Sequence, residues 1–410
     1  LAEIPVDMLK KYAPYLYNDY IEKQLPGSLK YGMIDGKLYG IPMPAGILYR
    51  KPMVWRGDWL KNVGITKVPE TLEEMEAALT AFRYNDPDGN GEKDTYGMTA
   101  QANNLHEMFS SVFGAFDAYP GYFREKNGKI VRGEIEPGAK QALEVLQRWH
   151  RNELIDPEFV VNKYNNFEDK VLTGKAGAVE FYWWYFLPGS AFIGGTTWYD
   201  RLKENNPDFT WETVGGIKGP EGHWGIAQYN PSFASGVMFG KHLEQDREKM
   251  IKYLQVFEAA MFDPEFYEAL NFGEKGVHWQ FNEKGIVEFI PPYDDEQERK
   301  KAGLGGYSMP GSFNDYDFQL SYVSDEAYRD WAKETRAKGS RVIDILAPYS
   351  KPVYNEYNDR LRQFTLETFI DFITGRKSLD QFDRFVEEWR AMGGDAVLEE
   401  AQQIYDTQLK

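Results

Sequence analysis

Residues 174–186, GKAGAVEFYWWYF, combine a turn with small and apolar side chains that only Glu180 interrupts after Lys175. The pattern predicts a turn at Gly174 and then a buried strand that continues through Phe186. Helix patterns stand on both sides of it. Thr71 and Glu74 predict a capping box at a helix start, Pro137 predicts another start, and residues 247–261 place apolar side chains at helical spacing. This alternation of strand and helix patterns predicts an α/β fold.

The C-terminal part, residues 351–410, carries mostly helical patterns. Ser378 with Gln381 predicts a further capping box, and Gly393 with Gly394 predicts the end of the helix that follows. We therefore expect a helical C-terminal segment.

Length and composition exclude several classes of protein. The 410 residues predict two or three domains at roughly 150 residues each. The balance of 47 basic and 64 acidic residues gives a net charge of −17, which repels phosphate backbones and argues against nucleic-acid binding. The absence of cysteine excludes disulfides and thiol chemistry. The longest apolar run, Phe181 to Leu187, is far shorter than the ~20 residues that span a bilayer. Because the sequence opens on Leu1 without a signal peptide, we expect a processed or truncated soluble chain.

Enzyme signatures are few in this sequence. None of the five histidines forms a zinc-protease helix motif, and His242 follows Gly240-Lys241 where a phosphate-binding loop needs serine or threonine. Residues 306–310 resemble a nucleophile elbow, but Pro310 replaces its second glycine. A glycosidase carboxylate pair is neither excluded nor located by the sequence. Glu180, beside two tryptophans, is the one candidate for such an enzyme.

A loop rich in oxygen side chains predicts a cation site. Calcium prefers six to eight oxygens at roughly 2.3–2.6 Å. The loop matches an EF-hand as far as its ninth position and departs at the twelfth, where Gly97 replaces the bidentate glutamate. We expect one structural Ca²⁺ far from any organic ligand, with a metal-free turn as the alternative. The expected ligands are Asp86, Asp88, Asn90, Glu92 (by its carbonyl) and Asp94.

Aromatic side chains predict a sugar-like ligand. Residues 180–186 contain six aromatics, and flat rings stack on the apolar faces of sugars. We expect Trp183 and Trp184 to face Trp279 across a cleft, with an irregular backbone at one of the adjacent pair, since a strand would turn them to opposite faces. The further expected contacts are Tyr182, Trp198, Trp224, Tyr229, His278 and Tyr354, with Arg56, Lys175 and His278 as partners for a uronate carboxylate. Trp59, Trp149 and Trp389 lie on helix stripes and are expected in the core.

Several segments in order resemble the extracellular solute-binding proteins, family 1, of ABC importers, and among them the oligosaccharide-binding lipoproteins of Gram-positive bacteria. The similarity extends over nearly the whole chain. The segments that carry it are Ile34–Pro42, Val54–Leu60, Val68–Glu74, the cation loop with Asp94–Gly97, Phe272–Trp279, and the closing helices with Gly375, Leu379, Phe382, Val386, Trp389 and Gly393–Asp395.

The resemblance implies a two-lobed periplasmic-binding-protein fold of type II that closes at a hinge, without catalysis. It implies an N-terminal lobe from residues 1–110 with part of 230–330, and a C-terminal lobe from residues 111–230 with 331–410. Members begin with further strands, so we expect either that the first strands of the N-terminal lobe are absent from this chain or that the lobe is built differently. The implied function is delivery of an oligosaccharide to a membrane permease by a monomer that is lipid-anchored on the extracellular face. A secreted glycoside hydrolase or lyase with the same aromatic cleft stays the alternative.

Overall fold

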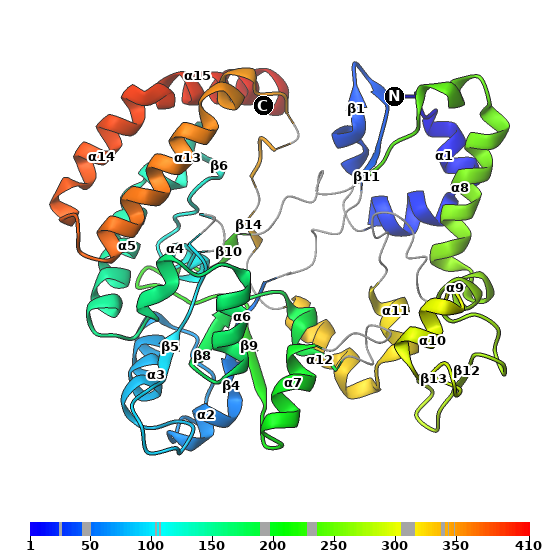
Figure 1. Cartoon of the computed structure of the whole chain (residues 1–410). Coiled ribbons are helices and arrows are strands. Elements are labelled where there is room, and N and C mark those ends of the chain that lie inside the picture. The colour runs from blue at the N-terminus through cyan, green and yellow to red at the C-terminus, as the bar shows by residue number, and fades with distance from the viewer. Residues whose placement is uncertain are drawn as a thin grey trace. The chain divides into compact units, whose positions relative to one another are not determined.

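The computed structural model describes residues 1–23, 27–42, 51–102, 105, 108–188, 197–227, 236–304, 316–337, 341–342, 344–347 and 349–410. Its contacts divide the chain into two compact units, each built from separate stretches of sequence (Figure 1). The first unit comprises Leu1–Leu48, Leu187–Thr197 and Tyr229–Lys333, and the second comprises Tyr49–Phe186, Trp198–Gln228 and Glu334–Lys410.

The first division of the chain falls at residue 48, not near residue 110 as expected from the resemblance. The reason lies in strand pairing. Strand β4 (Met53–Arg56) pairs with β8 (Ala176–Glu180) and β9 (Trp211–Val214), and these bonds tie its segment to the second unit. The last division, at residues 333 and 334, falls inside helix α12 (Glu326–Ala337).

The second unit is built on a four-stranded sheet in the order β5-β8-β4-β9. Strand β5 (Tyr96–Met98) runs parallel to β8, whereas β4 runs antiparallel to both of its neighbours. All residues of β4 and β8 are buried, including the charged residues at their ends, Arg56 and Glu180. The other strands and short helical turns of this unit are β6 (Phe123–Lys126), β7 (Lys129–Arg132), β10 (Ile226–Ala227), β14 (Arg341–Val342), η3 (Gly133–Ile135), η4 (Pro157–Val160), η5 (Trp183–Phe186) and η8 (Leu379–Gln381).

Two helices of the second unit begin where the sequence predicts. Helix α3 (Leu72–Tyr84) follows Thr71, whose side chain and that of Glu74 form the complete capping box. Helix α5 starts at Pro137 and ends at Arg151, before Pro157. The predicted core indoles Trp59, Trp149 and Trp389 are 1%, 0% and 0% exposed. The other helices are α2 (Gly57–Asn62), α4 (Ser110–Gly114), α6 (Tyr164–Leu172), α7 (Trp198–Asn205), α13 (Pro352–Ile373), α14 (Phe382–Trp389) and α15 (Asp395–Ile404).

The C-terminal helices confirm the helical segment and correct its details (Figure 1). Ser378 caps the short turn η8 by accepting from the Asp380 N–H, so it does not form a box with Gln381. The chain also continues in helical form beyond Gly393, through η9 (Arg390–Gly394) into α15, with a kink at Gly393. Gly393 has φ +114, and a Cβ there would lie 2.3 Å from the Tyr357 ring, so only glycine fits this kink. The last turn is η10 (Tyr405–Leu409).

The first unit is mainly helical among its described residues. Its core gathers apolar side chains from both ends of its sequence, including Leu9, Leu16, Leu38, Val237 and Leu254. Strand β3 (Ile41–Pro42) pairs with β11 (Gly236–Val237) and joins those ends. Its other elements are α1 (Val6–Tyr12), η1 (Leu16–Glu22), η2 (Ser28–Gly32), β1 (Met33–Ile34), β2 (Lys37–Leu38), η7 (Lys241–Glu244), α8 (Arg247–Phe262), α9 (Pro264–Phe272), β12 (Trp279–Phe281), β13 (Val287–Phe289), α10 (Glu296–Lys301) and α11 (Tyr316–Val323).

Length and polarity together decide whether a helix can cross a bilayer. Within the described part of the chain, no helix is both long and apolar enough to do so.

Candidate functional site

The aromatic run of residues 181–186 does not continue the buried strand. Strand β8 ends at Glu180, and Trp183–Phe186 form the 3₁₀ turn η5. The 3₁₀ turn breaks the alternation of a strand, but the two adjacent indoles still face different surroundings. Trp183 is fully buried, whereas Trp184 is half-buried and keeps part of its indole accessible. The expectation of a strand through Phe186 is therefore wrong, and the expectation of an irregular backbone at the tryptophan pair is confirmed.

Tyr182 and Trp184 form a stacked pair, which we call the aromatic shelf. Their ring centroids lie 4.5 Å apart with an interplanar angle of 21°. The Lys51 Nζ lies 4.5 Å from the centroid of the Tyr182 ring. Both shelf residues are half-buried. Preorganised aromatic faces with limited side-chain freedom suit the apolar face of a sugar ring, so the shelf is the candidate ligand platform of the second unit.

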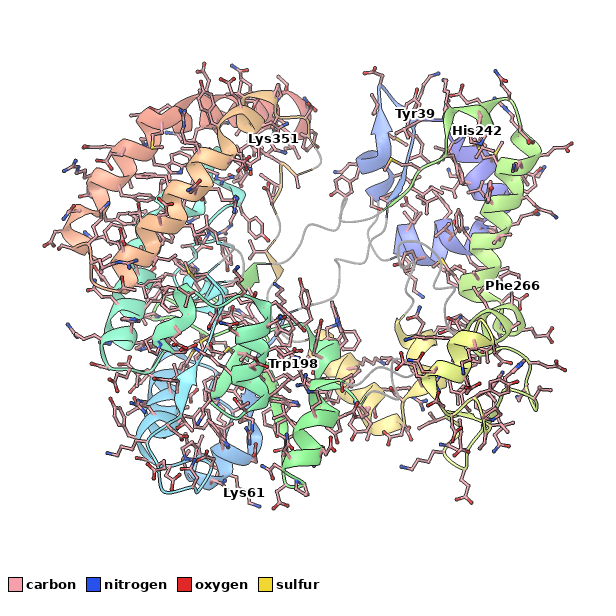
Figure 2. All side chains as sticks on the ribbon, in the orientation of Figure 1. Tyr39, Lys61, Trp198, His242, Phe266 and Lys351 are labelled. Carbon is pink, nitrogen blue, oxygen red and sulfur yellow. The ribbon has the colours of Figure 1, made fainter. Side chains whose placement is uncertain are left out.

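Trp198 belongs to the core of the second unit instead of to a ligand surface (Figure 2). It is 1% exposed, and its ring stacks on Phe181 with centroids 4.5 Å apart. Its Nε1–H donates to the Glu168 carboxylate at 2.7 Å. The prediction missed this because Trp198 opens helix α7, whose apolar side turns inward. Trp183, also buried, has the same packing role.

In the first unit, Trp279 and His278 lie at the start of the β12–β13 hairpin. Trp279 is fully buried, and its Nε1–H donates to the Gly273 carbonyl at 3.1 Å. Its predicted place at a ligand surface is not observed, because the strand turns its indole toward Phe272. His278 is half-buried and accepts the Glu274 N–H at Nδ1 over 2.9 Å, which leaves Nε2 as the protonated nitrogen of the neutral ring.

Arg56 is engaged within the second unit and does not offer its guanidinium to a uronate. It is 4% exposed and forms a two-pronged pair with Asp58, through Nε at 2.8 Å and a terminal nitrogen at 2.5 Å. Its guanidinium also lies over the rings of Trp59 and Phe209. Lys175, the second expected uronate partner, pairs with Asp94.

Two other predicted contacts are half-buried in the second unit. Tyr354 lies at the start of α13 with its ring edge-on to Phe123 at 5.3 Å. Trp224 lies beneath the Lys218 ammonium, 5.9 Å from its ring centroid. Tyr229 lies outside the described residues. Of the predicted set, ring contacts bring together Tyr182, Trp183 and Trp184.

Glu180, the candidate for the enzyme alternative, is a buried structural carboxylate. It accepts the N–H groups of Ser110 and Ser111, each at 2.8 Å, and the Ser111 hydroxyl. Burial raises the pKa of Glu180 above its usual range, against the lowering effect of these hydrogen bonds and of the Lys51 charge. Three donors from the start of α4 hold the carboxylate, so it anchors that helix to β8 just before the aromatic shelf.

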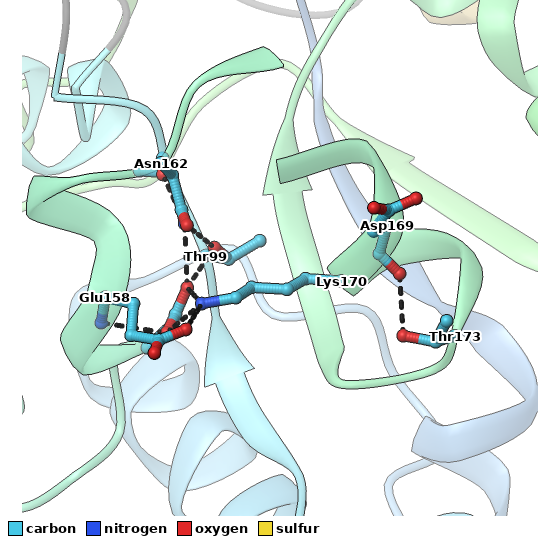
Figure 3. Close-up of polar contacts among 8 residues, drawn as sticks. Thr99, Glu158, Asn162, Asp169, Lys170 and Thr173 are labelled. Carbon is cyan, nitrogen blue, oxygen red and sulfur yellow. Dashed lines mark hydrogen bonds and ion pairs between the residues drawn. The ribbon is translucent and has the colours of Figure 1, made fainter. Parts of the chain in front are cut away.

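A buried polar network that the sequence did not reveal lies at the end of β5, the strand that pairs with β8 (Figure 3). Asp156 is 1% exposed and accepts from Thr99 Oγ1 and Asn162 Nδ2, each at 2.8 Å. The Lys170 ammonium lies 2.7 Å from both carboxylate oxygens. In the sequence, Asp156 is distinguished only by its place before Pro157. The network ties β5 to α6 and so fixes the strands that precede the shelf.

The oxygen-rich loop folds upon itself. Asp86 accepts the N–H groups of Asn90 and Gly91, each at 3.0 Å, and the Asn90 amide nitrogen donates to Asp88 at 3.0 Å and to Asp94 at 3.3 Å. The pKa of Asp88 is raised, chiefly by burial and then by its neighbouring carboxyls. The Lys175 ammonium and its hydrogen bond lower the pKa of Asp94.

The fit of this loop to a hard cation is good in donor type. Asp88 and Asp94 accept from the Asn90 side-chain amide, and Asp86 accepts from the backbone of the same turn. The Asn90 side-chain oxygen accepts the Glu92 N–H at 2.7 Å, so the loop gathers carboxylate and amide oxygens, the donor types that Ca²⁺ prefers. In the described part of the chain, no group of three acidic or histidine side chains is arranged to hold an ion as it stands. In this loop the carboxylates are held by the protein's own donors.

Comparison with known proteins shows which proteins this chain resembles in sequence. Residues 2–237 match the family described as bacterial extracellular solute-binding protein. Lipoprotein LipO of Bacillus subtilis is 26% identical over 389 residues, covering 92% of this chain and 73% of LipO. The polygalacturonan/rhamnogalacturonan-binding protein YtcQ of the same organism is 24% identical over 393 residues, covering 91% of this chain and 71% of YtcQ.

Solved structures agree with this relationship at the level of fold. The substrate-binding protein FusA of S. pneumoniae in complex with kestose gives a TM-score of 0.65 at 17% identity, covering 100% of this chain and 84% of FusA. The alginate-binding protein AlgQ2, solved without calcium ion, gives a TM-score of 0.63 at 20% identity, covering 99% of this chain and 82% of AlgQ2. These neighbours are two-lobed solute-binding proteins, so the predicted fold class is confirmed. This chain belongs to the bacterial extracellular solute-binding protein family.

Proposed function

We propose that this chain binds an oligosaccharide and delivers it to the membrane subunits of an ABC importer, without catalysis. Its family supports a binding role, and two relatives are named for carbohydrate ligands: YtcQ for polygalacturonan and rhamnogalacturonan, and FusA for fructooligosaccharide. The observation that carries the proposal is the aromatic shelf of Tyr182 and Trp184, which is preorganised and half-buried in the second unit. In this proposal the two compact units are the two lobes, and ligand stabilises their closed state because it binds that state more tightly.

The adjacent tryptophans provide a matched test of the shelf. Trp184→Ala removes an accessible ring, so oligosaccharide affinity is expected to fall about two- to tenfold, which corresponds to ~0.5–1.5 kcal/mol of stacking, while the melting temperature changes little. Trp183→Ala removes a fully buried ring and is expected to cost ~3–5 kcal/mol of stability. Affinity is measured by following tryptophan fluorescence or heat during titration with fructo-oligosaccharides and oligogalacturonides. An unchanged affinity in Trp184→Ala would reject the shelf as the platform.

The proposal includes one structural Ca²⁺ in the loop of Asp86 to Asp94. Two solved neighbours support this proposal: AlgQ2 was solved without calcium ion, and FusA was solved as an EF-hand mutant in complex with fructo-nystose. Calcium would contribute charge neutralisation of Asp86, Asp88 and Asp94. Because binding to the folded state alone stabilises it, a hundredfold excess over Kd is expected to add about 2.7 kcal/mol.

Calcium and chelator distinguish this loop from a metal-free turn. Chelator is expected to lower the melting temperature of the wild type, and Asp88→Ala is expected to remove the calcium effect. Sugar affinity is expected to change little with chelator, since the loop lies at the opposite end of the β5–β8 pair from the shelf. A melting curve that chelator does not move would reject the calcium role.

We further propose that the protein acts as a monomer on the extracellular face of the membrane, held by a lipid anchor, and docks on two permease subunits. The family is extracellular, and LipO is named a lipoprotein. Co-purification of the protein with membranes when it is produced in its native host, and its release by removal of the lipid, would test the anchor.

A further inference from the structure

Lys175 lies where the oxygen-rich loop meets strand β8. Its ammonium pairs with the Asp94 carboxylate, and the two side chains are 41% and 38% exposed. Its backbone is held on both sides: its N–H donates to the Lys170 carbonyl at 2.8 Å, and its carbonyl accepts the Tyr96 N–H at 2.8 Å. Because the backbone is fixed by these bonds, only the side chain of Lys175 can move away from Asp94.

Asp94 is the loop carboxylate that already has a positively charged partner. Asp86 and Asp88 are held by neutral donors, the backbone N–H groups and the Asn90 amide. Lys93, the other lysine near the loop carboxylates, is exposed and forms no ion pair among the described residues. A divalent ion that takes Asp94 as a ligand therefore meets the Lys175 ammonium at the same carboxylate, and like charges at one carboxylate repel.

We propose that Lys175 is an internal cation that competes with Ca²⁺ for Asp94 and thereby sets the calcium affinity of the loop. The inference rests on the proposed calcium role of this loop. Without calcium, the ammonium neutralises part of the carboxylate cluster and keeps the loop closed. With calcium, Lys175 must give up its pair with Asp94, so the affinity is lower than the ligands alone would provide. The pair is well exposed, so the effect is modest and screened by salt.

The experiment compares three variants of the full chain by calorimetric titration with CaCl₂ at low salt, after removal of metal. Lys175→Met keeps the aliphatic stem and removes the charge. It is expected to bind calcium about two- to fivefold more tightly than the wild type, as the loss of one exposed ion pair predicts. Lys93→Met removes one positive charge from the loop itself without breaking an ion pair. Lys175→Arg keeps a cation beside Asp94. Both control variants are expected to stay closer than Lys175→Met to the calcium affinity of the wild type.

A second readout follows the same variants without calcium. In chelator, Lys175→Met is expected to melt below the wild type, because Asp94 has lost its counter-ion, and the difference is expected to shrink when calcium saturates the loop. Raising salt toward 1 M, where the Debye length is ~3 Å, is expected to reduce the affinity difference.

The outcomes separate this inference from the calcium role itself. If the wild type binds calcium and Lys175→Met binds it equally or more weakly, the competing role is wrong while the metal site stands. If Lys93→Met gains as much affinity as Lys175→Met, the effect is one of net charge, and the specific role of Lys175 is wrong. If neither the wild type nor any variant binds calcium, the proposed calcium role fails and the inference with it. Binding by Lys175→Met alone would support the competition.

Discussion

Glu180 shows how a single residue can mislead a prediction of chemistry. A carboxylate beside two tryptophans suggests an acid or base, yet three donors from Ser110 and Ser111 occupy it. Glu180→Gln is expected to lower the free energy of unfolding by about 1–3 kcal/mol, because its amide NH₂ would face N–H donors in a buried site. Ser111→Ala, which removes one hydroxyl donor, is expected to cost less, about 0.5–1.5 kcal/mol. Urea unfolding measures both. Wild-type stability in Glu180→Gln would contradict the anchoring role.

His150 gives a residue-scale prediction of pH dependence. Burial lowers the pKa of His150 below its ordinary 6.5, and the nearby Arg376 charge lowers it further. Below pH 6.5 the unfolded chain therefore binds more protons at this residue than the folded chain, so its contribution to stability is lost as the pH falls through that range. His150→Asn is expected to lose less melting temperature than the wild type between pH 7.5 and 5.5. His242→Asn, at an exposed histidine of the first unit, is the control. Equal losses in wild type and His150→Asn would contradict this.

At the scale of elements, the Asp156 network makes the connection of β5 to α6 a discrete stabilising unit. Lys170 is 17% exposed at its side chain and Asp156 is 1% exposed, so removal of the ammonium leaves a buried carboxylate without its cation. Lys170→Met is expected to cost ~3–5 kcal/mol. Lys163→Met, at an exposed lysine just before α6, is expected to change stability by less than ~0.5 kcal/mol. Denaturant unfolding of the two variants measures the difference, and similar values would show that the network contributes little.

Elements with local signals could be predicted, and those decided by tertiary contacts could not. The capping box at Thr71, the proline at the start of α5 and the helical spacing of α8 each act within a few residues, and the structure confirms them. The aromatic run after β8 carries no such signal. Its turn depends on packing of Phe181 against Trp198, which the sequence does not display. The indoles were recognised as a group, but which of them is buried depended on the same packing.

At the scale of the whole molecule, the resemblance predicted family and fold, whereas the division of the chain needed the structure. Pairing of β4 with β8 and β9 takes residues 49–110 into the second unit, and no local pattern marks that pairing. The aromatic shelf lies in this unit, together with the network and the helix anchor that hold its strand. The second unit is therefore expected to supply the stacking surface for ligand.

Isothermal titration of the chain with defined fructo-oligosaccharides and oligogalacturonides tests the proposed function most directly, because one trace reports both binding and turnover. For at least one oligosaccharide, the heat is expected to saturate at one ligand per chain, with micromolar affinity on the order of −8 kcal/mol, and the baseline is expected to return after every injection. Heat that continues after each injection would show turnover of the ligand and would contradict a binding protein without catalysis.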